Sequence, residues 1–150
     1  FRAFQHDNFT YALAMPGVMY RSRTGLTDFE EGPNLFNPDM RHSALLKRGN
    51  QLFVFWTERN DAPERIYVSH IDLSTEWETW TRSNPVEVLR AEFPWEGSNL
   101  PVEPSRGGSI NVPVNQIRDP AIYEEDGRVY LLYAIAGERG ISLAEVHVSP

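Results

Sequence analysis

The sequence predicts an all-β protein of the β-propeller type, built from repeated antiparallel four-stranded sheets. Three segments share one order: a short strand, a polar turn, a strongly β-forming strand, a second turn and a third strand. Aromatic residues make up 12% of the 150 residues, which suits sheets better than helical bundles. No window shows sustained helical periodicity, so any helix is at most a turn or two. Together these observations describe about three blades of an incomplete propeller within one domain, 1–150.

The three repeated units follow one another, with a long loop before the last. The unit boundaries that we expect are 1–38, 39–91 and 115–150, with the loop at 92–114. The expected strands of the first unit are 1–5, 9–14 and 18–22. Those of the second unit are 43–47, 51–56 and 65–70, with an outer strand from 77–80 or 86–89. Those of the third unit are 121–124, 128–133 and 140–145.

Turn chemistry and strand composition support each unit. Gly49-Asn50 and Asp126-Gly127 suit two-residue hairpins, because Gly, Asn and Asp tolerate positive φ. The middle strands are nearly continuous in apolar residues, as expected of strands that are covered on both faces. The segment 92–114 contains four prolines and three glycines, so we expect a loop there. Loops of this length in compact domains are often functional.

Three units leave open sheet edges. Closed propellers have four to eight blades, and exposed strand edges pair readily with other chains. We therefore expect a homodimer or a higher homo-oligomer that forms through exposed blade edges, or a piece of a longer protein. The alternative arrangement is a sandwich built from the same strands.

Composition excludes several classes of partner and chemistry. A net charge of −7 and a pI near 5.1 argue against nucleic acid, which requires a basic face. The absence of cysteine excludes disulfides and thiolate chemistry. No apolar run is long enough to span a membrane, and no signal peptide is visible, so we expect a cytoplasmic protein. The histidines share no short spacing typical of zinc sites, so we expect neither a metal nor a cofactor.

The third unit carries the most specific motif. Arg118-Asp119-Pro120 is followed by the Asp126-Gly127 turn and an aromatic strand at 128–133. This segment resembles a blade of the five-bladed propeller glycosidases, the superfamily of glycoside hydrolase families 43 and 32. Looser similarity, through 20–33 and 40–43, is to the last three blades of uncharacterised proteins related to these hydrolases. The resemblance implies a truncated member that has about three of five blades.

The resemblance also implies a role for Asp119. In that superfamily the Asp of Arg-Asp-Pro projects into a central funnel, where it orients the ligand and tunes the pKa of the catalytic acid. Glycoside hydrolysis uses two carboxyl groups that flank the scissile bond, and the base or nucleophile would lie in the missing blades or in a partner. Glu31-Gly32-Pro33 echoes the acid-bearing motif, but its distance from the next strand argues against that role. From the residues alone, Asp119 could instead cap a turn.

A second dipeptide of interest follows from the repeat. Arg41-His42 is the equivalent of Arg118-Asp119, so all four side chains should face one funnel and bind ligand there. Histidine side chains ordinarily titrate near neutral pH, so His42 could transfer protons. The alternative for His42 is a structural or surface role.

Loop residues complete the set of candidates. Trp95, Glu96 and Glu103 could bind a sugar, because an aromatic face covers C–H groups and carboxylates accept hydroxyls. The alternative is a loop anchored by a buried Trp. Glu58 and Arg65 flank the loop 60–63, and they either pair with each other or rim the pocket.

Three functions remain open from the sequence. The first is the binding of a carbohydrate or a similar polar ligand in the funnel. The second is glycoside hydrolysis that becomes possible only when another subunit completes the funnel. The third is structural assembly without a ligand.

Overall fold

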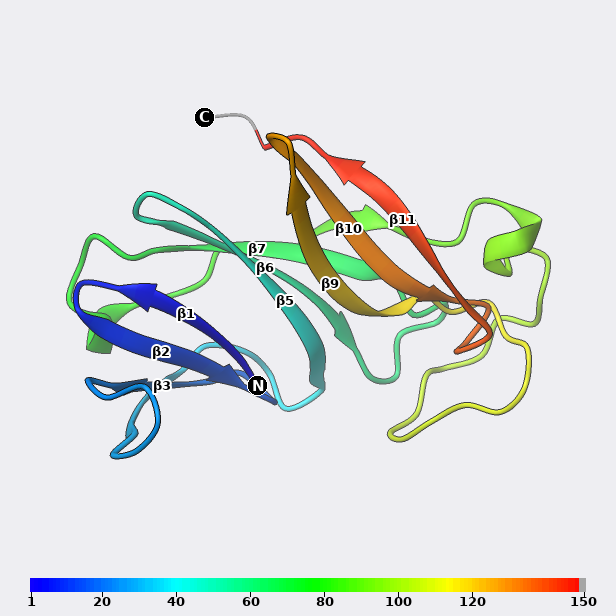
Figure 1. Cartoon of the computed structure of the whole chain (residues 1–150). Coiled ribbons are helices and arrows are strands. Elements are labelled where there is room, and N and C mark those ends of the chain that lie inside the picture. Colours follow the sequence, from blue (N-terminus) through cyan, green and yellow to red (C-terminus); the bar gives the residue numbers. More distant parts are fainter. Residues whose placement is uncertain (149–150) are drawn as a thin grey trace.

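The computed structural model describes residues 1–148 and consists of three antiparallel sheets, which confirms the all-β prediction (Figure 1). The strands of the first sheet are β1 (Arg2–His6), β2 (Phe9–Ala14), β3 (Val18–Ser22) and β4 (Glu30–Asn34). Those of the second sheet are β5 (Met40–Arg48), β6 (Gln51–Glu58), β7 (Ile66–Asp72) and β8 (Val86–Leu89). Those of the third sheet are β9 (Arg118–Glu125), β10 (Arg128–Ile135) and β11 (Gly140–Val146). Ser149 and Pro150 of the expected third unit lie outside the described residues.

Each sheet is an up-and-down meander, in which strands that neighbour each other in sequence pair with each other. The first two sheets have four strands, and the third has three within the described residues. Trp77–Thr79 forms a short 3₁₀ turn, η1, so the outer strand of the second sheet is β8 alone. The first hairpin of the third sheet turns through Asp126 and Gly127, both at positive φ, as the composition predicts.

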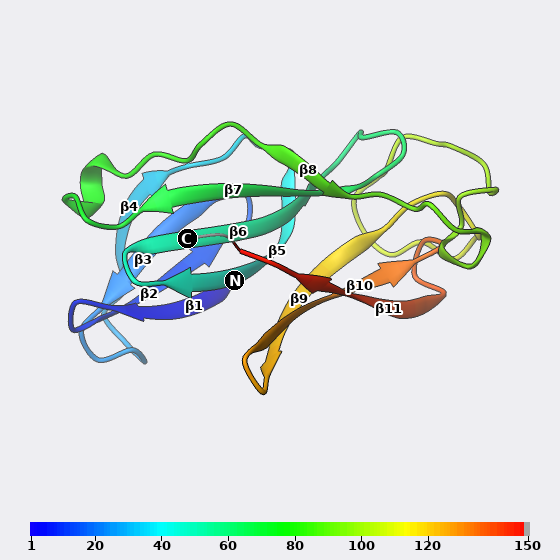
Figure 2. The ribbon, with the colours of Figure 1, turned by 90° about the horizontal axis from the view of Figure 1, so that it is seen from above.

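The second sheet lies between the other two and is covered on both faces (Figure 2). On β6, the side chains of Leu52, Val54 and Trp56 pack into a core shared with the first sheet. Phe55, between them, packs into a second core shared with the third sheet. The alternation follows from the two-residue period of a strand, and it explains why β6 is apolar at every position from Leu52 to Trp56.

The first strands of the three sheets meet in the middle of the molecule. β5 lies between β1 and β9 and contacts both (Figure 1). The long segment before β9 contains one 3₁₀ turn, η2 (Pro94–Glu96), and is otherwise irregular. Backbone hydrogen bonds fix it to the loop after β6: Ser105 donates its N–H to Asp61 O at 3.0 Å, and Asn60 donates to Ser105 O at 3.0 Å. This attachment holds the loop over the start of β5.

The described residues include no helix with the length and apolar character needed to cross a membrane.

Candidate functional site

The candidate site is built on two β-bulges at equivalent places in the second and third sheets. Arg41 precedes the start of β6 by ten residues, and Arg118 precedes the start of β10 by the same ten. At each place the first strand carries one extra residue relative to its partner strand. The residue after each arginine has a positive φ, +35° at His42 and +55° at Asp119. His and Asp are among the few non-glycine residues that tolerate this region, and a bulge re-aims its side chain.

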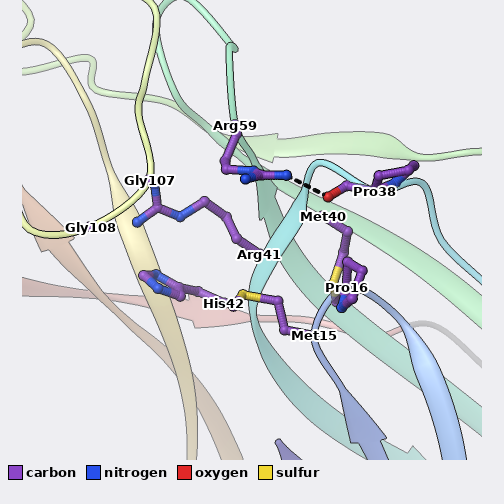
Figure 3. A pocket seen from close by; sticks show the side chains of 9 residues that line it. All are labelled: Met15, Pro16, Pro38, Met40, Arg41, His42, Arg59, Gly107 and Gly108. Atoms are coloured by element: carbon purple, nitrogen blue, oxygen red, sulfur yellow. Dashed lines mark hydrogen bonds between the residues drawn. The ribbon is translucent and has the colours of Figure 1, made fainter.

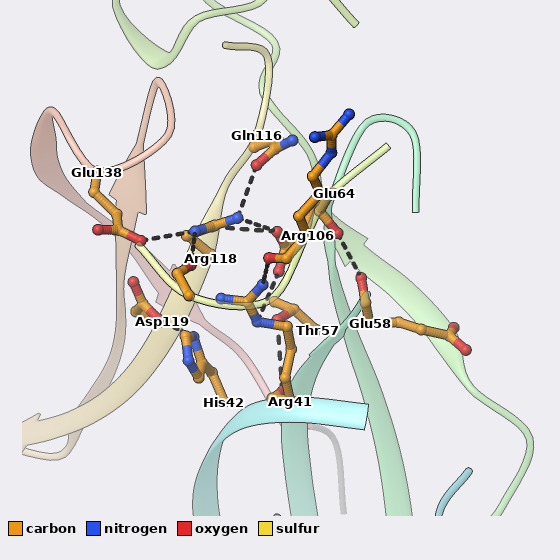
Figure 4. A network of polar contacts seen from close by, with 12 residues as sticks. Arg41, His42, Thr57, Glu58, Glu64, Arg106, Gln116, Arg118, Asp119 and Glu138 are labelled. Atoms are coloured by element: carbon orange, nitrogen blue, oxygen red, sulfur yellow. Dashed lines mark hydrogen bonds and ion pairs between the residues drawn. The ribbon is translucent and has the colours of Figure 1, made fainter. Parts of the chain in front are cut away.

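The two re-aimed side chains meet. His42 Nδ1 contacts Asp119 Oδ1 across the gap between β5 and β9 (Figure 4). Their side chains are 35% and 40% exposed, so the pair is accessible to a ligand. Burial raises the pKa of Asp119, but the hydrogen bond and charge of His42, together with the charges of Arg118 and Arg41, outweigh it and lower the pKa overall. Asp119 is therefore a carboxylate at neutral pH.

Behind this pair lies a buried network of charged groups. Arg118 donates to Glu64 Oε2 from Nε at 3.2 Å and from Nη2 at 2.9 Å, to Gln116 Oε1 at 2.8 Å and to Glu138 Oε1 at 2.7 Å. Arg41 lies on the other side of Glu64, with its Nε 3.7 Å from Oε1. Arg118, Glu64 and Arg41 are all buried. One buried carboxylate thus bridges the two equivalent arginines and ties the second sheet to the third (Figure 4).

Three neighbouring cavities open around the two dipeptides. The first, of about 290 Å³, is lined by Arg41 and His42 and by Met15 in the turn after β2. The second, of about 340 Å³, is lined by His42, Asp119, Ser43 and the start of the first sheet at Phe1 and Arg2. All three sheets thus contribute to this second cavity. The third, of about 300 Å³, lies under the long loop at Arg118.

The long loop contributes less to these cavities than the sequence suggests. Glu96 is buried, and its Oε2 accepts the backbone N–H groups of Glu92 and Phe93 while its Oε1 accepts the hydroxyl of Tyr133 at 2.7 Å. Glu96 therefore holds its own loop in place. Trp95 is exposed and stacks on Phe93 rather than anchoring the loop in the core. Neither Glu96 nor Trp95 lines the cavities at His42 and Asp119.

Two other loop residues do reach the site. Glu103 and Arg106 line the third cavity together with Arg118. The backbone of both also holds the network, because Glu103 O accepts from Gln116 Nε2 at 3.2 Å and Arg106 O accepts from Arg41 Nη1 at 2.6 Å.

Glu58 and Arg65 do not pair with each other. Glu58 accepts a hydrogen bond from Asn37 Nδ2 at 2.7 Å. Arg65 donates two hydrogen bonds to the carboxylate of Asp61, at 2.9 and 2.8 Å, and forms a further ion pair with Glu87 at 3.0 Å. The hydrogen bond from Arg65 to Asp61 is the largest influence on its pKa and raises it, so Arg65 serves as a structural cation.

Sequence reasoning missed Glu64, the carboxylate that joins the two arginines. Its backbone is held by Ile117, which donates its N–H to Glu64 O at 3.1 Å. A signal was available, since two arginines predicted to face one funnel require a nearby carboxylate once they are buried. Arg59 and Met15, which line the first cavity, were also missed because they lie in loops after second strands.

No cluster of three or more His, Cys, Asp or Glu side chains suited to a metal ion occurs within residues 1–148.

Comparisons with known proteins place the chain beside an uncharacterised viral protein. No model of a known protein family matches the chain. An uncharacterised protein of Acanthamoeba polyphaga mimivirus is 38% identical over 161 aligned residues, which cover 97% of this chain and 45% of the viral protein. The chain therefore corresponds to less than half the length of this relative and is similar to it over almost its own whole length.

Proposed function

We propose that this chain binds a small polar ligand of the carbohydrate class in the cavities around His42 and Asp119. The observation that carries the proposal is the convergence of all three sheets on the second cavity, where a carboxylate and an imidazole face the open space. A carboxylate accepts hydrogen bonds from hydroxyl groups, and an imidazole nitrogen donates or accepts them. Phe1, which is exposed and lines the same cavity, offers apolar surface for the C–H face of a sugar.

The resemblance of the third sheet to the propeller glycosidases supports the same ligand class. In that reading the three sheets are part of a larger funnel, and Asp119 has the place of the ligand-orienting carboxylate. Hydrolysis in addition requires two carboxyl groups that flank the glycosidic bond. Glu64 is buried and pairs with the two arginines. Glu138 is partly exposed and pairs with Arg118. Binding without hydrolysis is thus the function that these residues support best.

Calorimetric titration with a panel of monosaccharides and short oligosaccharides tests the proposal. We expect saturable binding that weakens roughly tenfold in Asp119→Asn, because a charged acceptor is lost. Asp72→Asn is the matched control, since Asp72 is a surface carboxylate whose pKa is also lowered, by its hydrogen bonds from Ser74. Binding that is equally strong in wild type and Asp119→Asn would refute the role of Asp119. Turnover of aryl glycosides that disappears in Asp119→Asn would favour hydrolysis instead.

A second function, assembly, is favoured by the outer face of the third sheet. Ile141 and Leu143 on β11 are 77% and 60% exposed, and they neighbour Ala134 and Leu132 of β10 in the pairing register. The inner face of this sheet is packed, whereas this apolar outer face has no covering sheet within the described residues. In the second sheet, both apolar faces are covered by other sheets of the same chain. We propose that a second copy covers the third sheet.

Light scattering after gel filtration tests the assembly. The wild type should elute as a dimer or higher oligomer, and Ile141→Lys should reduce the apparent mass. Val86→Lys is the matched control, because Val86 is also exposed and lies on the outer strand of the second sheet. A monomeric wild type at high concentration would overturn this second function without affecting ligand binding.

A further inference from the structure

The first cavity has an unusual charge pattern. Its basic lining residues are Arg41, His42 and Arg59, and its other lining residues are methionines, prolines and glycines (Figure 3). No carboxylate lines it among the described residues. The protein as a whole has a net charge of −7, so a cavity with only basic side chains is not a consequence of overall composition.

The carboxylates that balance these basic groups lie outside the lining. Glu64 lies 3.7 Å from Arg41 Nε, Asp119 contacts His42, and Asp39 lies 3.0 Å from Arg59 Nη2. A carboxylate placed behind a guanidinium or imidazole fixes its orientation and leaves its remaining donors for a ligand.

Arg41 illustrates this arrangement. Its Nε faces Glu64 and its Nη1 donates to the carbonyl of Arg106, and Nη2 makes no hydrogen bond with any described residue. Burial is the largest influence on the pKa of Arg41 and lowers it, more than Glu64 compensates. A bound anion would favour the charged form of this buried guanidinium.

The loop above the cavity allows a close approach. Gly107 and Gly108 line it, and the Arg41 side chain extends toward them (Figure 3). Gly108 has φ +88°, and a Cβ there would meet no atom within 4 Å, so this backbone borders open space. Without side chains, this stretch leaves room for an oxyanion beside the guanidinium.

We propose that the first cavity binds the anionic substituent of an acidic sugar, a carboxylate or a phosphate ester, whose ring occupies the second cavity. The inference rests on the proposed function and names its ligand class. The two cavities share His42 and Met15, so one ligand can reach both. In that position the anion lies against Arg59 and Arg41, while the sugar hydroxyls face Asp119. Guanidinium groups suit both kinds of oxyanion because their donors form a planar fork.

Matched sugars test the ligand class. Glucuronate, glucose 6-phosphate and glucose share one ring and differ in the charge at one end, and inorganic phosphate supplies the charge without the ring. By calorimetry we expect the two acidic sugars to bind at least about tenfold more tightly than glucose, as hydrogen bonds to charged groups imply. The preference for acidic sugars over glucose should decrease as salt is added, because salt screens the attraction between charges. The ratio between the two acidic sugars distinguishes a carboxylate site from a phosphate site.

Two variants locate the anion. Arg59→Gln should remove most of the preference for acidic sugars, while glucose binding is retained. Arg48→Gln should remove none of it, and it is a close control because Arg48 and Arg59 are both 43% exposed and each pairs with one carboxylate. Because Arg59 is partly exposed, its variant should fold.

The outcomes separate this inference from the proposed function. Equal affinities for glucose and the acidic sugars, or an acidic preference that survives Arg59→Gln, would overturn the inference while sugar binding stands. Phosphate binding alone, with no dependence on Asp119 for any sugar, would overturn both.

Discussion

The Arg41-His42 dipeptide of the second sheet and the Arg118-Asp119 dipeptide of the third sheet occupy the same place on the same kind of bulge. In both, the arginine is buried and the next residue, at positive φ, turns toward the cavities. The difference lies in that next residue, which is a base in one sheet and an acid in the other. The same type of β-bulge occurs in both sheets, and it brings an acid and a base into contact where the two sheets meet.

The two arginines differ in how completely they are held. Arg118 makes close hydrogen bonds with Glu64, Glu138 and Gln116, whereas Arg41 makes one close hydrogen bond, with Arg106 O, and a looser ion pair with Glu64. Removing one partner of a buried ion pair is costly because the other charge is left uncompensated. The comparison therefore predicts unequal dependence of stability on two equivalent arginines.

Arg118→Ala should produce the largest effect. We expect a loss of about 3 kcal/mol or more in the free energy of unfolding, measured by urea denaturation, because Glu64 loses its closest partner. Arg41→Ala should cost less, about 1–2 kcal/mol, since Arg118 still neutralises Glu64. Arg48→Ala, which removes an exposed ion pair with Glu124, is the control and should cost under about 1 kcal/mol. Equal losses of unfolding free energy in Arg41→Ala and Arg118→Ala would contradict the prediction that Arg118 contributes more to stability than Arg41.

An exchange of the two differing residues tests the equivalence of the bulges. His42→Asp places a carboxylate opposite Asp119 and should lower the free energy of unfolding by about 1–2 kcal/mol through like-charge repulsion. The double variant His42→Asp/Asp119→His restores an opposite pair. Both residue types tolerate positive φ, so the backbone should accept the exchange.

Urea denaturation of the two single variants and the double variant measures this coupling. We expect the double variant to recover most of the stability lost in His42→Asp. His42→Asn, which keeps the backbone preference without the charge, should cost less than His42→Asp. No recovery in the double variant would mean that the two bulges are not interchangeable.

The sheets and the two dipeptides could be predicted from sequence, because their signals are local. Nearly continuous apolar runs and the Asp126-Gly127 turn identify strands. The equal distance of Arg41 and Arg118 from the middle strands of their units makes the two arginines equivalent in the repeat. Glu64 could not be recognised in the same way, because its partner Arg118 lies more than fifty residues later in the chain. For the same reason, the sequence could not show that Trp95 and Glu96 lie away from the cavities at His42 and Asp119. Whether a loop residue faces a cavity or stabilises its own loop is decided by tertiary contacts.

The smallest expected effect concerns the pH dependence of the acid in the pair. The pKa of Asp119 is lowered in the folded protein, so its carboxylate stabilises the fold above the pKa of the unfolded chain, about 3.9. This contribution is lost as the pH falls through the lower pKa of the folded state. Because the side chain is 40% exposed, we expect it to amount to less than about 1 kcal/mol at neutral pH.

Denaturation of wild type and Asp119→Asn across a pH series measures this contribution. The difference between their free energies of unfolding should be constant from neutral pH to about pH 5 and should narrow as the pH is lowered through about 4 and below. Glu124→Gln, at the exposed pair with Arg48, controls for the general effect of removing a surface carboxylate. A difference that stays constant to low pH, or that widens on acidification, would mean that Asp119 gains nothing from His42 and the two arginines. The acid and base would then share a location without being coupled.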